Sequence, residues 1–354
     1  MSRFWIDSVS TLNPYVPGEQ SVAQSFLKLN TNEHALPPSE TVMAAISAIS
    51  GEQLRRYPDP TARLLSAAIA EQEGLPIEQV FVGNGSDEVL AHLWAAFLAH
   101  RPVTTLDITY GFYPVWSQLY GSMLTQSPLR DDFSVDIGLL MNTQGALVLA
   151  NPNAPTGLSI TRSQIESLVT ADRNRLIVID EAYYGFGAET AAPLTRHYDN
   201  LIVTRSLSKS HSLAGLRVGY ALAHSELIDG LNRIKDSFNS YPLDSVAQAA
   251  ATAAIQDKKW SSHALEVIIN SRRNISDGLL GMGFEVLPSQ ANFIFTRPGT
   301  GSGLALFNAL RQENILVRRW DSPRIADWLR ISIGTPEQTQ LLLTAVAEML
   351  DRAD

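Results

Sequence analysis

One lysine, Lys209, follows a predicted buried strand at 201–204 and lies in a segment rich in serine and glycine, 206–219. Hydroxyl groups, backbone N–H groups and an arginine such as Arg217 are the usual ligands of a phosphate group. A lysine beside a phosphate site can form a Schiff base with an aldehyde cofactor, provided that burial and nearby positive charge lower its pKa. The segment therefore predicts a pyridoxal phosphate site, although a lysine in an isolated Ser-x-Lys is more often an ordinary loop residue.

A second candidate for phosphate binding follows the predicted strand 80–82. Gly85 and Ser86 stand just before a predicted apolar helix, 89–98, where free backbone N–H groups can bind an anion. The third glycine of a dinucleotide-binding turn is missing. Asp87 and Glu88 are equally typical of an ordinary helix N-terminus, so this segment alone leaves both interpretations open.

Two more strand ends carry polar or aromatic residues. Tyr110 follows the predicted strand 103–106 and could stack on a planar cofactor, although a core aromatic residue is the alternative. The turn 151–157 follows the strand 146–150, and its prolines predict a rigid bend whose side-chain amides, among them that of Asn153, point toward the strand ends. A plain turn remains possible.

Asp180 directly follows three branched apolar residues, 177–179, and is expected to be partly buried. A buried carboxylate needs a partner. A protonated pyridine nitrogen is such a partner, and keeping it protonated makes the ring an electron sink. A salt bridge or a helix cap would explain Asp180 as well.

These candidates share one edge of a predicted sheet. Seven β-rich runs alternate with helical patterns, which predicts an α/β fold with a mostly parallel seven-stranded sheet covered on both faces. Ligands of such sheets bind at the carboxyl ends of the strands. The runs are 80–82, 103–106, 123–125, 146–150, 176–179, 201–204 and 218–222.

A helical pattern after Lys235 leads into a second, smaller α+β region. Its predicted strands lie near 284–287, 292–295, 315–318 and 328–333, and its last helix at 336–350. No linker separates the two regions, so a boundary near 265 is expected within or beside a long helix. We predict an N-terminal arm that is part of the small domain (1–40), a large domain (41–265) and a small C-terminal domain (266–354).

The composition predicts a soluble cytoplasmic protein. The chain has 354 residues, 45% of them hydrophobic, with no cysteine. No run of about 18 apolar residues could span a membrane, and no signal peptide is evident. A net charge of −9 argues against nucleic-acid binding, which needs clustered Lys and Arg. The absence of cysteine excludes disulfides, and the scattered histidines lack the spacing of metal ligands, so no metal site is expected.

Taken in order, these segments resemble the fold-type-I aminotransferases, and among them the histidinol-phosphate aminotransferases, over nearly the whole chain. The resemblance implies a large pyridoxal-phosphate-binding domain and a smaller α+β domain. The matching pieces are 12–18, 28–33, 56–59, 83–88, 151–157, 180–183, 206–217, 289–293 and 329–335.

The resemblance implies a role for each matching residue. Lys209 would bind the cofactor covalently and move a proton between the substrate Cα and the cofactor C4′ carbon. Asp180 would pair with the pyridine nitrogen, Tyr183 would bond the phenolic oxygen, and Tyr110 would stack on the ring. The full set of cofactor-binding candidates is Tyr57, Gly85, Ser86, Asp87, Tyr110, Asn153, Asp180, Tyr183, Ser206, Ser208, Lys209 and Arg217.

The resemblance also implies a homodimer with shared active sites, in which Tyr57 reaches the phosphate site of the neighbouring subunit. The candidates for substrate binding are Tyr15, Asn292, Arg318 and Arg330. Arg330 is expected to face the cofactor because its neighbours on the strand point to the opposite face. A structural or surface salt bridge is the alternative for Arg318.

The sequence departs from the family pattern at two places, Ala154 and the pair His34–Ala35. Ala154 stands where the family has an asparagine, and Asn153 could take its place. His34 and Ala35 replace a usual Asn-Pro pair. His211, two residues after the lysine, is expected to lie at the rim of the site.

The predicted reaction transfers an amino group from histidinol phosphate to 2-oxoglutarate, giving imidazole acetol phosphate and glutamate, a step of histidine biosynthesis. An aromatic amino-acid aminotransferase and a threonine-phosphate decarboxylase are alternatives on the same fold. A catalytically silent pyridoxal-phosphate-binding domain is the alternative outside enzymes.

Overall fold

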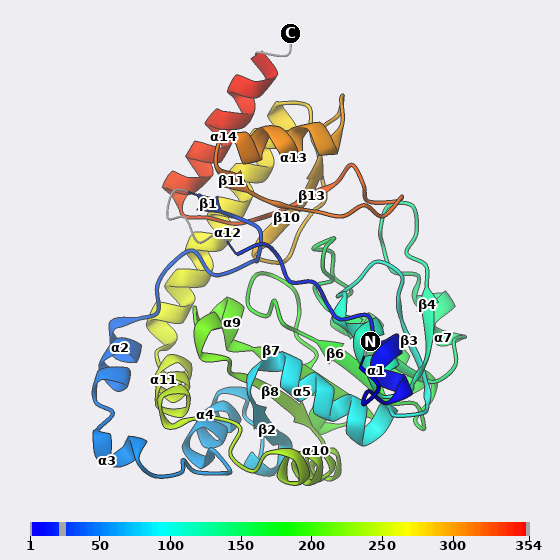
Figure 1. The fold of residues 1–354 in the computed structure, drawn as a ribbon, viewed down its shortest axis with the longest axis vertical. Helices are drawn as coiled ribbons and strands as arrows, with labels where there is room; N and C mark the ends of the chain where they lie inside the picture. The colour runs from blue at the N-terminus through cyan, green and yellow to red at the C-terminus, as the bar shows by residue number, and fades with distance from the viewer. Residues whose placement is uncertain (1, 21–25, 352–354) are drawn as a thin grey trace.

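A seven-stranded sheet forms the centre of the larger part of the chain in the computed structural model, which describes residues 2–20 and 26–351 (Figure 1). Strand β8 runs antiparallel to both of its neighbours, and the other six strands share one direction. This confirms the predicted mostly parallel sheet. In spatial order the strands are β2 (Val80–Gly83), β8 (Gly219–Ala223), β7 (Leu201–Ser206), β6 (Ile177–Asp180), β5 (Ala146–Ala150), β3 (Pro102–Leu106) and β4 (Met123–Ser127).

Both faces of this sheet are buried, which explains why its central strands are continuous apolar runs. Alternate residues enter different cores: Leu147 and Leu149 pack into one, and Val148 into the other. The first core is covered mainly by α4 (Arg63–Glu73), α8 (Arg162–Ala171) and α11 (Ser245–Gln256). The second is covered by α5 (Gly85–Leu93), α6 (Phe112–Leu119) and α10 (Ser225–Phe238).

The smaller region contains a four-stranded antiparallel sheet. Its order is β12 (Arg318–Arg319), β13 (Leu329–Ser332), β10 (Phe293–Arg297) and β9 (Glu285–Val286). A third core joins this sheet to α12 (Lys258–Gly281), α13 (Gly303–Gln312) and α14 (Pro336–Asp351). Figure 1 shows α12 extending from α11, beside the larger sheet, up to this region.

One strand of the N-terminal segment joins the smaller region. Strand β1 (Leu27–Lys28) pairs in parallel with β11 (Ile315–Leu316), so residues 27–28 lie beside a strand near the C-terminal end of the chain. Residue 265 falls inside α12, and the division of the chain there stays a prediction. The remaining helices are α1 (Asp7–Thr11), α2 (Glu40–Ser47), α3 (Gly51–Leu54), α7 (Ile137–Met141) and α9 (Leu207–Ser210).

One helix boundary differs from the prediction. The helix expected at 89–98 begins at Gly85 and ends at Leu93, and a π-helical turn, Trp94–Leu98, continues it. The helix therefore starts at the strand end, next to the candidate phosphate ligands. Among the helices of residues 2–20 and 26–351, none is long and apolar enough to cross a membrane.

Candidate active site

A cavity of about 230 Å³ lies where the N-terminal segment, the carboxyl ends of the larger sheet and the smaller region meet. It brings together twelve of the predicted site residues: Tyr15, Ser86, Asp87, Tyr110, Asp180, Tyr183, Ser206, Ser208, Lys209, Arg217, Arg318 and Arg330. A larger hollow of about 660 Å³ surrounds Lys235 and Pro242 but is lined by none of the predicted residues. We therefore place the chemistry in the smaller cavity.

Lys209 lies on α9, which begins directly after β7 and so places the amine at the strand exit. Its Nζ donates a hydrogen bond to the backbone carbonyl of Thr31 over 3.1 Å. Burial, together with the positive charge of Arg330, lowers the pKa of Lys209 to about 8. Near neutral pH a larger fraction of the Lys209 amine is therefore neutral, and so nucleophilic, than for an ordinary exposed lysine.

Asp180 is the last residue of β6 and is only 3% exposed. Tyr113 donates to its Oδ2 over 2.8 Å, and Thr204 donates to its Oδ1 over 3.1 Å. Burial raises the pKa of Asp180 to about 6, while these two hydrogen bonds oppose the shift. A positive charge placed against the carboxylate would favour its ionised form, so the site suits a protonated ring nitrogen.

The phosphate candidates gather at the start of α5. Gly85 does not line the cavity; it has φ +82°, and a Cβ there would lie 2.6 Å from Nη2 of Arg217. A Cβ at Gly219 would lie 2.3 Å from the backbone nitrogen of Ser86. The two glycines therefore leave the guanidinium and an N–H group close together at one helix N-terminus, as an anion site requires.

Asp87 links this end of the cavity to an aromatic wall. Its Oδ2 accepts from Nη2 of Arg217 over 2.9 Å, and its Oδ1 accepts from the Tyr110 hydroxyl over 2.9 Å. Ser206 accepts at its hydroxyl from the backbone N–H of Ser208 over 3.1 Å. These contacts hold the arginine and the predicted stacking ring in fixed positions.

Arg330 provides a cation at the opposite end. Its Nη2 donates to the carbonyl of Asn30 over 2.8 Å, and its buried Nε has no partner within the described part of the chain. The Trp320 ring lies near both Arg330 and Arg318, with ring-to-guanidinium distances of 5.3 and 5.5 Å. A buried N–H donor without a partner is what an anionic substrate group would satisfy.

Besides Gly85, three predicted residues do not line the cavity. Asn153 is buried in its turn, where its side chain bonds Ile108, Thr109 and Thr156, so it does not replace the amide missing at Ala154. Asn292 lies behind the cavity and donates to the carbonyl of Asn32 over 2.9 Å. Tyr57 is 81% exposed and stacks on Tyr241.

The rim position predicted for His211 is also wrong. The side chain is 4% exposed, its Nδ1 lies 2.8 Å from the Ser210 hydroxyl, and it does not line the cavity. Burial lowers the pKa of His211 to about 4 and keeps the ring neutral.

Sequence reasoning missed several residues of the site. The segment 30–32 lies in the matching piece 28–33, but no side-chain pattern could indicate that its backbone carbonyls bond Lys209 and Arg330 in the cavity. Tyr113 and Trp320 carried only a weak signal, as aromatic residues near candidate positions. Thr204 was detectable, because it stands two residues before Ser206 on the same strand face.

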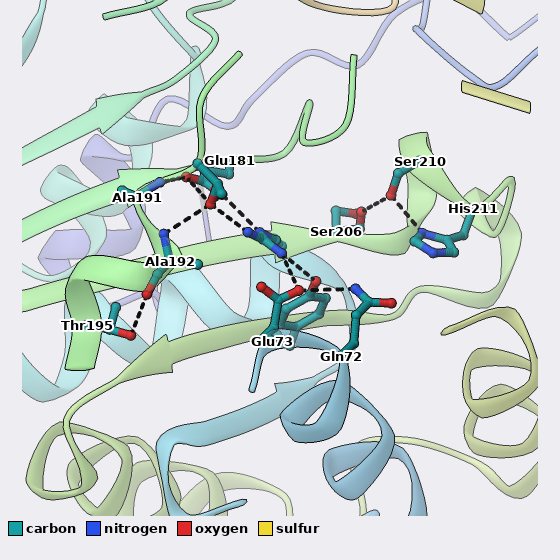
Figure 2. Close-up of polar contacts among 12 residues, drawn as sticks. Gln72, Glu73, Glu181, Ala191, Ala192, Thr195, Ser206, Ser210 and His211 are labelled. Atoms are coloured by element: carbon teal, nitrogen blue, oxygen red, sulfur yellow. Dashed lines mark hydrogen bonds and ion pairs between the residues drawn. The ribbon is translucent and has the colours of Figure 1, made fainter. Parts of the chain in front are cut away.

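An ion network supports the strand ends from the other side of the sheet (Figure 2). Arg205, 1% exposed, donates to Glu181 over 2.9 Å and to Glu73 over 2.7 Å. Its guanidinium also lies 3.5 Å from the centroid of the Tyr184 ring. Glu181 directly follows Asp180, and Arg205 directly precedes Ser206. The ion pair between Glu181 and Arg205 therefore links the ends of β6 and β7.

The comparisons with known proteins agree with this geometry. A family model for aminotransferase class I and II matches residues 24–346. The chain belongs to the aminotransferase class I and II family. This confirms the family and the enzyme class predicted from the motifs.

Individual relatives cover the whole chain. The histidinol-phosphate aminotransferase of Gluconacetobacter diazotrophicus is 51% identical over 99% of each chain. Histidinol-phosphate aminotransferase 1 of Bradyrhizobium diazoefficiens is 50% identical over 99% of this chain and all of the relative. The structure of histidinol-phosphate aminotransferase from Sinorhizobium meliloti, solved in complex with pyridoxal-5'-phosphate, has a TM-score of 0.90 at 25% identity and covers 100% of this chain and 99% of its own.

The cavity fits that cofactor. It offers a lysine of lowered pKa, a buried carboxylate of raised pKa and an anion site at a helix N-terminus. These groups match an aldehyde, a ring nitrogen and a phosphate. The described residues contain no cluster of three or more His, Asp or Glu side chains that could hold a metal ion.

Proposed function

We propose that this chain is a pyridoxal-phosphate-dependent aminotransferase that exchanges an amino group between histidinol phosphate and 2-oxoglutarate. The observation that carries the proposal is one cavity holding Lys209, Asp180 and Arg330. The relatives named for this activity, about half identical over the full chain, support it.

The chain's own residues would divide the work along the cavity. Arg217 and the N–H of Ser86 would hold the phosphate, Tyr110 the ring face, and Asp180 the ring nitrogen. The cofactor supplies an electron sink for the charge left when the substrate Cα loses its proton. Lys209, with a pKa lowered to about 8 by burial, would anchor the cofactor and then accept and return that proton.

Both substrates need the same cation. Glutamate carries a carboxylate and histidinol phosphate a phosphate, and one planar guanidinium can receive either anion. Arg330 suits this role because it is held by Asn30 and still has an unpartnered Nε among the described residues. Tyr15 and Arg318 also line the cavity and would complete the substrate pocket.

The proposed assembly is a cytoplasmic homodimer with shared sites. Tyr57 lies outside its own chain's cavity and forms an exposed aromatic patch with Tyr241, on which it stacks. Such a patch is typical of an interface. A second copy covering it would bring Tyr57 to the partner's phosphate site.

Covalent labelling tests the cofactor role of Lys209. Borohydride reduction of the purified protein, followed by peptide mapping, should place the cofactor on Lys209. Lys209→Ala should lose the label, while Lys235→Ala, at another buried lysine, should keep it. Label on a different lysine, or none, would contradict the proposal.

Substrate comparison tests the reaction. With 2-oxoglutarate as acceptor, kcat/KM should be higher for histidinol phosphate than for phenylalanine or tyrosine. Preference for the aromatic amino acids would change the substrate but keep the cofactor chemistry. Release of carbon dioxide from threonine phosphate would indicate the decarboxylase, and absence of turnover with bound cofactor would indicate a silent domain.

A further inference from the structure

We propose that Asn32 is a positioning residue that turns the hydroxyl of Tyr183 into the cavity as a hydrogen-bond donor. The inference deepens the proposed function and rests on it for the identity of the acceptor, an oxygen of the bound cofactor. The underlying geometry lies in a relay of three side chains: Ser332, Asn32 and Tyr183.

The orientation of the Asn32 amide follows from its partners. The backbone N–H of Asn32 donates to the Ser332 hydroxyl oxygen over 2.8 Å, and that hydroxyl donates to Oδ1 of Asn32 over 2.9 Å. Since a serine has a single hydroxyl hydrogen, this contact assigns Oδ1 to the serine side. The amide NH₂ group then faces Tyr183, whose oxygen is 3.0 Å from Nδ2.

This contact determines what Tyr183 can do. An NH₂ group only donates, so the phenol oxygen accepts, and the hydrogen of Tyr183 is left for another acceptor. Among the described residues no acceptor bonds that hydrogen, and Tyr183 lines the cavity beside Lys209. An edge-on contact with Phe293, at 4.9 Å between ring centroids, holds the ring in place.

The backbone around Asn32 is held firmly enough to act as a support. Asn32 is 1% exposed and has φ +55°, a left-handed conformation that asparagine tolerates better than most residues. Asn292 donates to its carbonyl, and Lys209 donates to the carbonyl before it. Ala154 belongs to the apolar cluster against which Tyr183 packs and offers only a methyl group, so the amide of Asn32 is the polar side chain that bonds this phenol.

The relay is also connected to substrate binding. Ser332 and Arg330 are two residues apart on β13 and therefore share one face of the strand. An anion that binds Arg330 thus contacts the strand that holds the Asn32 amide. The donation from Asn32 strengthens Tyr183 as a donor, because hydrogen bonds in a chain polarise one another.

A pH titration of the bound cofactor's absorbance in the holoenzyme tests the link. Without Asn32, Tyr183 is a weaker donor and stabilises the ionised cofactor oxygen less. Asn32→Ala should therefore raise the apparent pKa of the bound cofactor by about half to one pH unit, which corresponds to one neutral hydrogen bond. In a Tyr183→Phe background the same change should shift the pKa by less than about 0.2 pH unit, because the relay is already broken. Equal shifts in both backgrounds would show a purely structural role and overturn the proposal.

Two further measurements keep the test decisive. Ser332→Ala leaves the Asn32 side chain in place but frees its amide to rotate, so it should shift the titration in the same direction by less. In cofactor-free protein with isotope-labelled tyrosine, the NMR signal of the Tyr183 ring carbon bearing the hydroxyl should change in Asn32→Ala. An unchanged NMR signal would overturn the relay. If the wild-type protein did not bind the cofactor at Lys209, the proposed function would be contradicted, but the NMR signal of the cofactor-free protein would still test the relay.

Discussion

Tyr113 donates its phenol hydrogen to Oδ2 of Asp180 over 2.8 Å, although 67 positions separate the two residues in the chain. Helix α6 brings the tyrosine to the end of β6 from one face of the sheet. Thr204 donates to the other oxygen and the backbone of Ala182 also bonds the carboxylate, so its donors are neutral and no cation is among its bonded partners in the described structure. The site is therefore short of one positive charge, which a protonated ring nitrogen would supply.

Asp180→Asn should have opposite effects on activity and on the stability of the cofactor-free protein. An amide cannot hold the ring nitrogen protonated, so single-turnover proton abstraction should lose about 2–5 kcal/mol of transition-state stabilisation. Burial raises the pKa of Asp180 from 3.8 to about 6 in the folded state, so its contribution to stability is present below pH 3.8 and lost as pH rises through 6. The variant should therefore be more stable above pH 6, by up to about 3 kcal/mol.

Denaturant unfolding at pH 4 and pH 8, at one protomer concentration, measures the second effect. The wild-type free energy of unfolding should fall more between these pH values than that of the variant. A variant with wild-type turnover and an unchanged pH dependence would show that the essential carboxylate lies elsewhere.

Arg205→Met should destabilise the protein by about 3–5 kcal/mol, because Glu73 and Glu181 would remain buried without their cation. Arg173→Met is the matched control, since its pair with Asp199 is exposed and should contribute about 0–1 kcal/mol. Urea titration of both variants gives the comparison. Equal losses would mean that the network of Figure 2 contributes no more than a surface pair.

Tyr57→Ala and Lys209→Ala should complement each other if the sites are shared across a dimer. A heterodimer of the two variants has one site with both residues intact, so its activity should be about half that of wild type. Differently tagged chains allow the heterodimer to be isolated and assayed. Two inactive single variants that stay inactive in a verified heterodimer would exclude sharing through Tyr57.

Arg330→Lys should lower kcat/KM for both glutamate and histidinol phosphate by about tenfold to a hundredfold, because a point charge replaces a planar fork. Arg318→Lys is the comparison at the neighbouring position, because Arg318 pairs with Arg330 across β12 and β13. Its guanidinium contacts the carbonyls of Val16 and Pro17 at 3.4 and 3.5 Å, and its effect should be smaller. If kcat/KM fell for only one of the two substrates, Arg330 would not bind both anions.

The position predicted for Asn153 is wrong, which shows that a local sequence pattern does not determine which side chain of a turn faces the cavity. Asn153 and Ala154 are adjacent in a tight turn, and only Ala154 lines the cavity. The residue types predict the turn, but the backbone rotation within it decides which side chain faces inward. Asn292 likewise does not line the cavity, and its side chain donates to the carbonyl of Asn32.

The sequence alone determined the sheet and the positions of Lys209, Asp180 and Arg217, because buried parallel strands are continuous apolar runs whose carboxyl ends meet at one edge. Tertiary structure decided which groups face them. Tyr113 reaches Asp180, and the carbonyl of Thr31 reaches Lys209 across 178 positions, only after helices and the N-terminal segment pack against the sheet. Such contacts form only when whole helices and segments pack against the sheet, so the spacing of residues along the chain does not predict them.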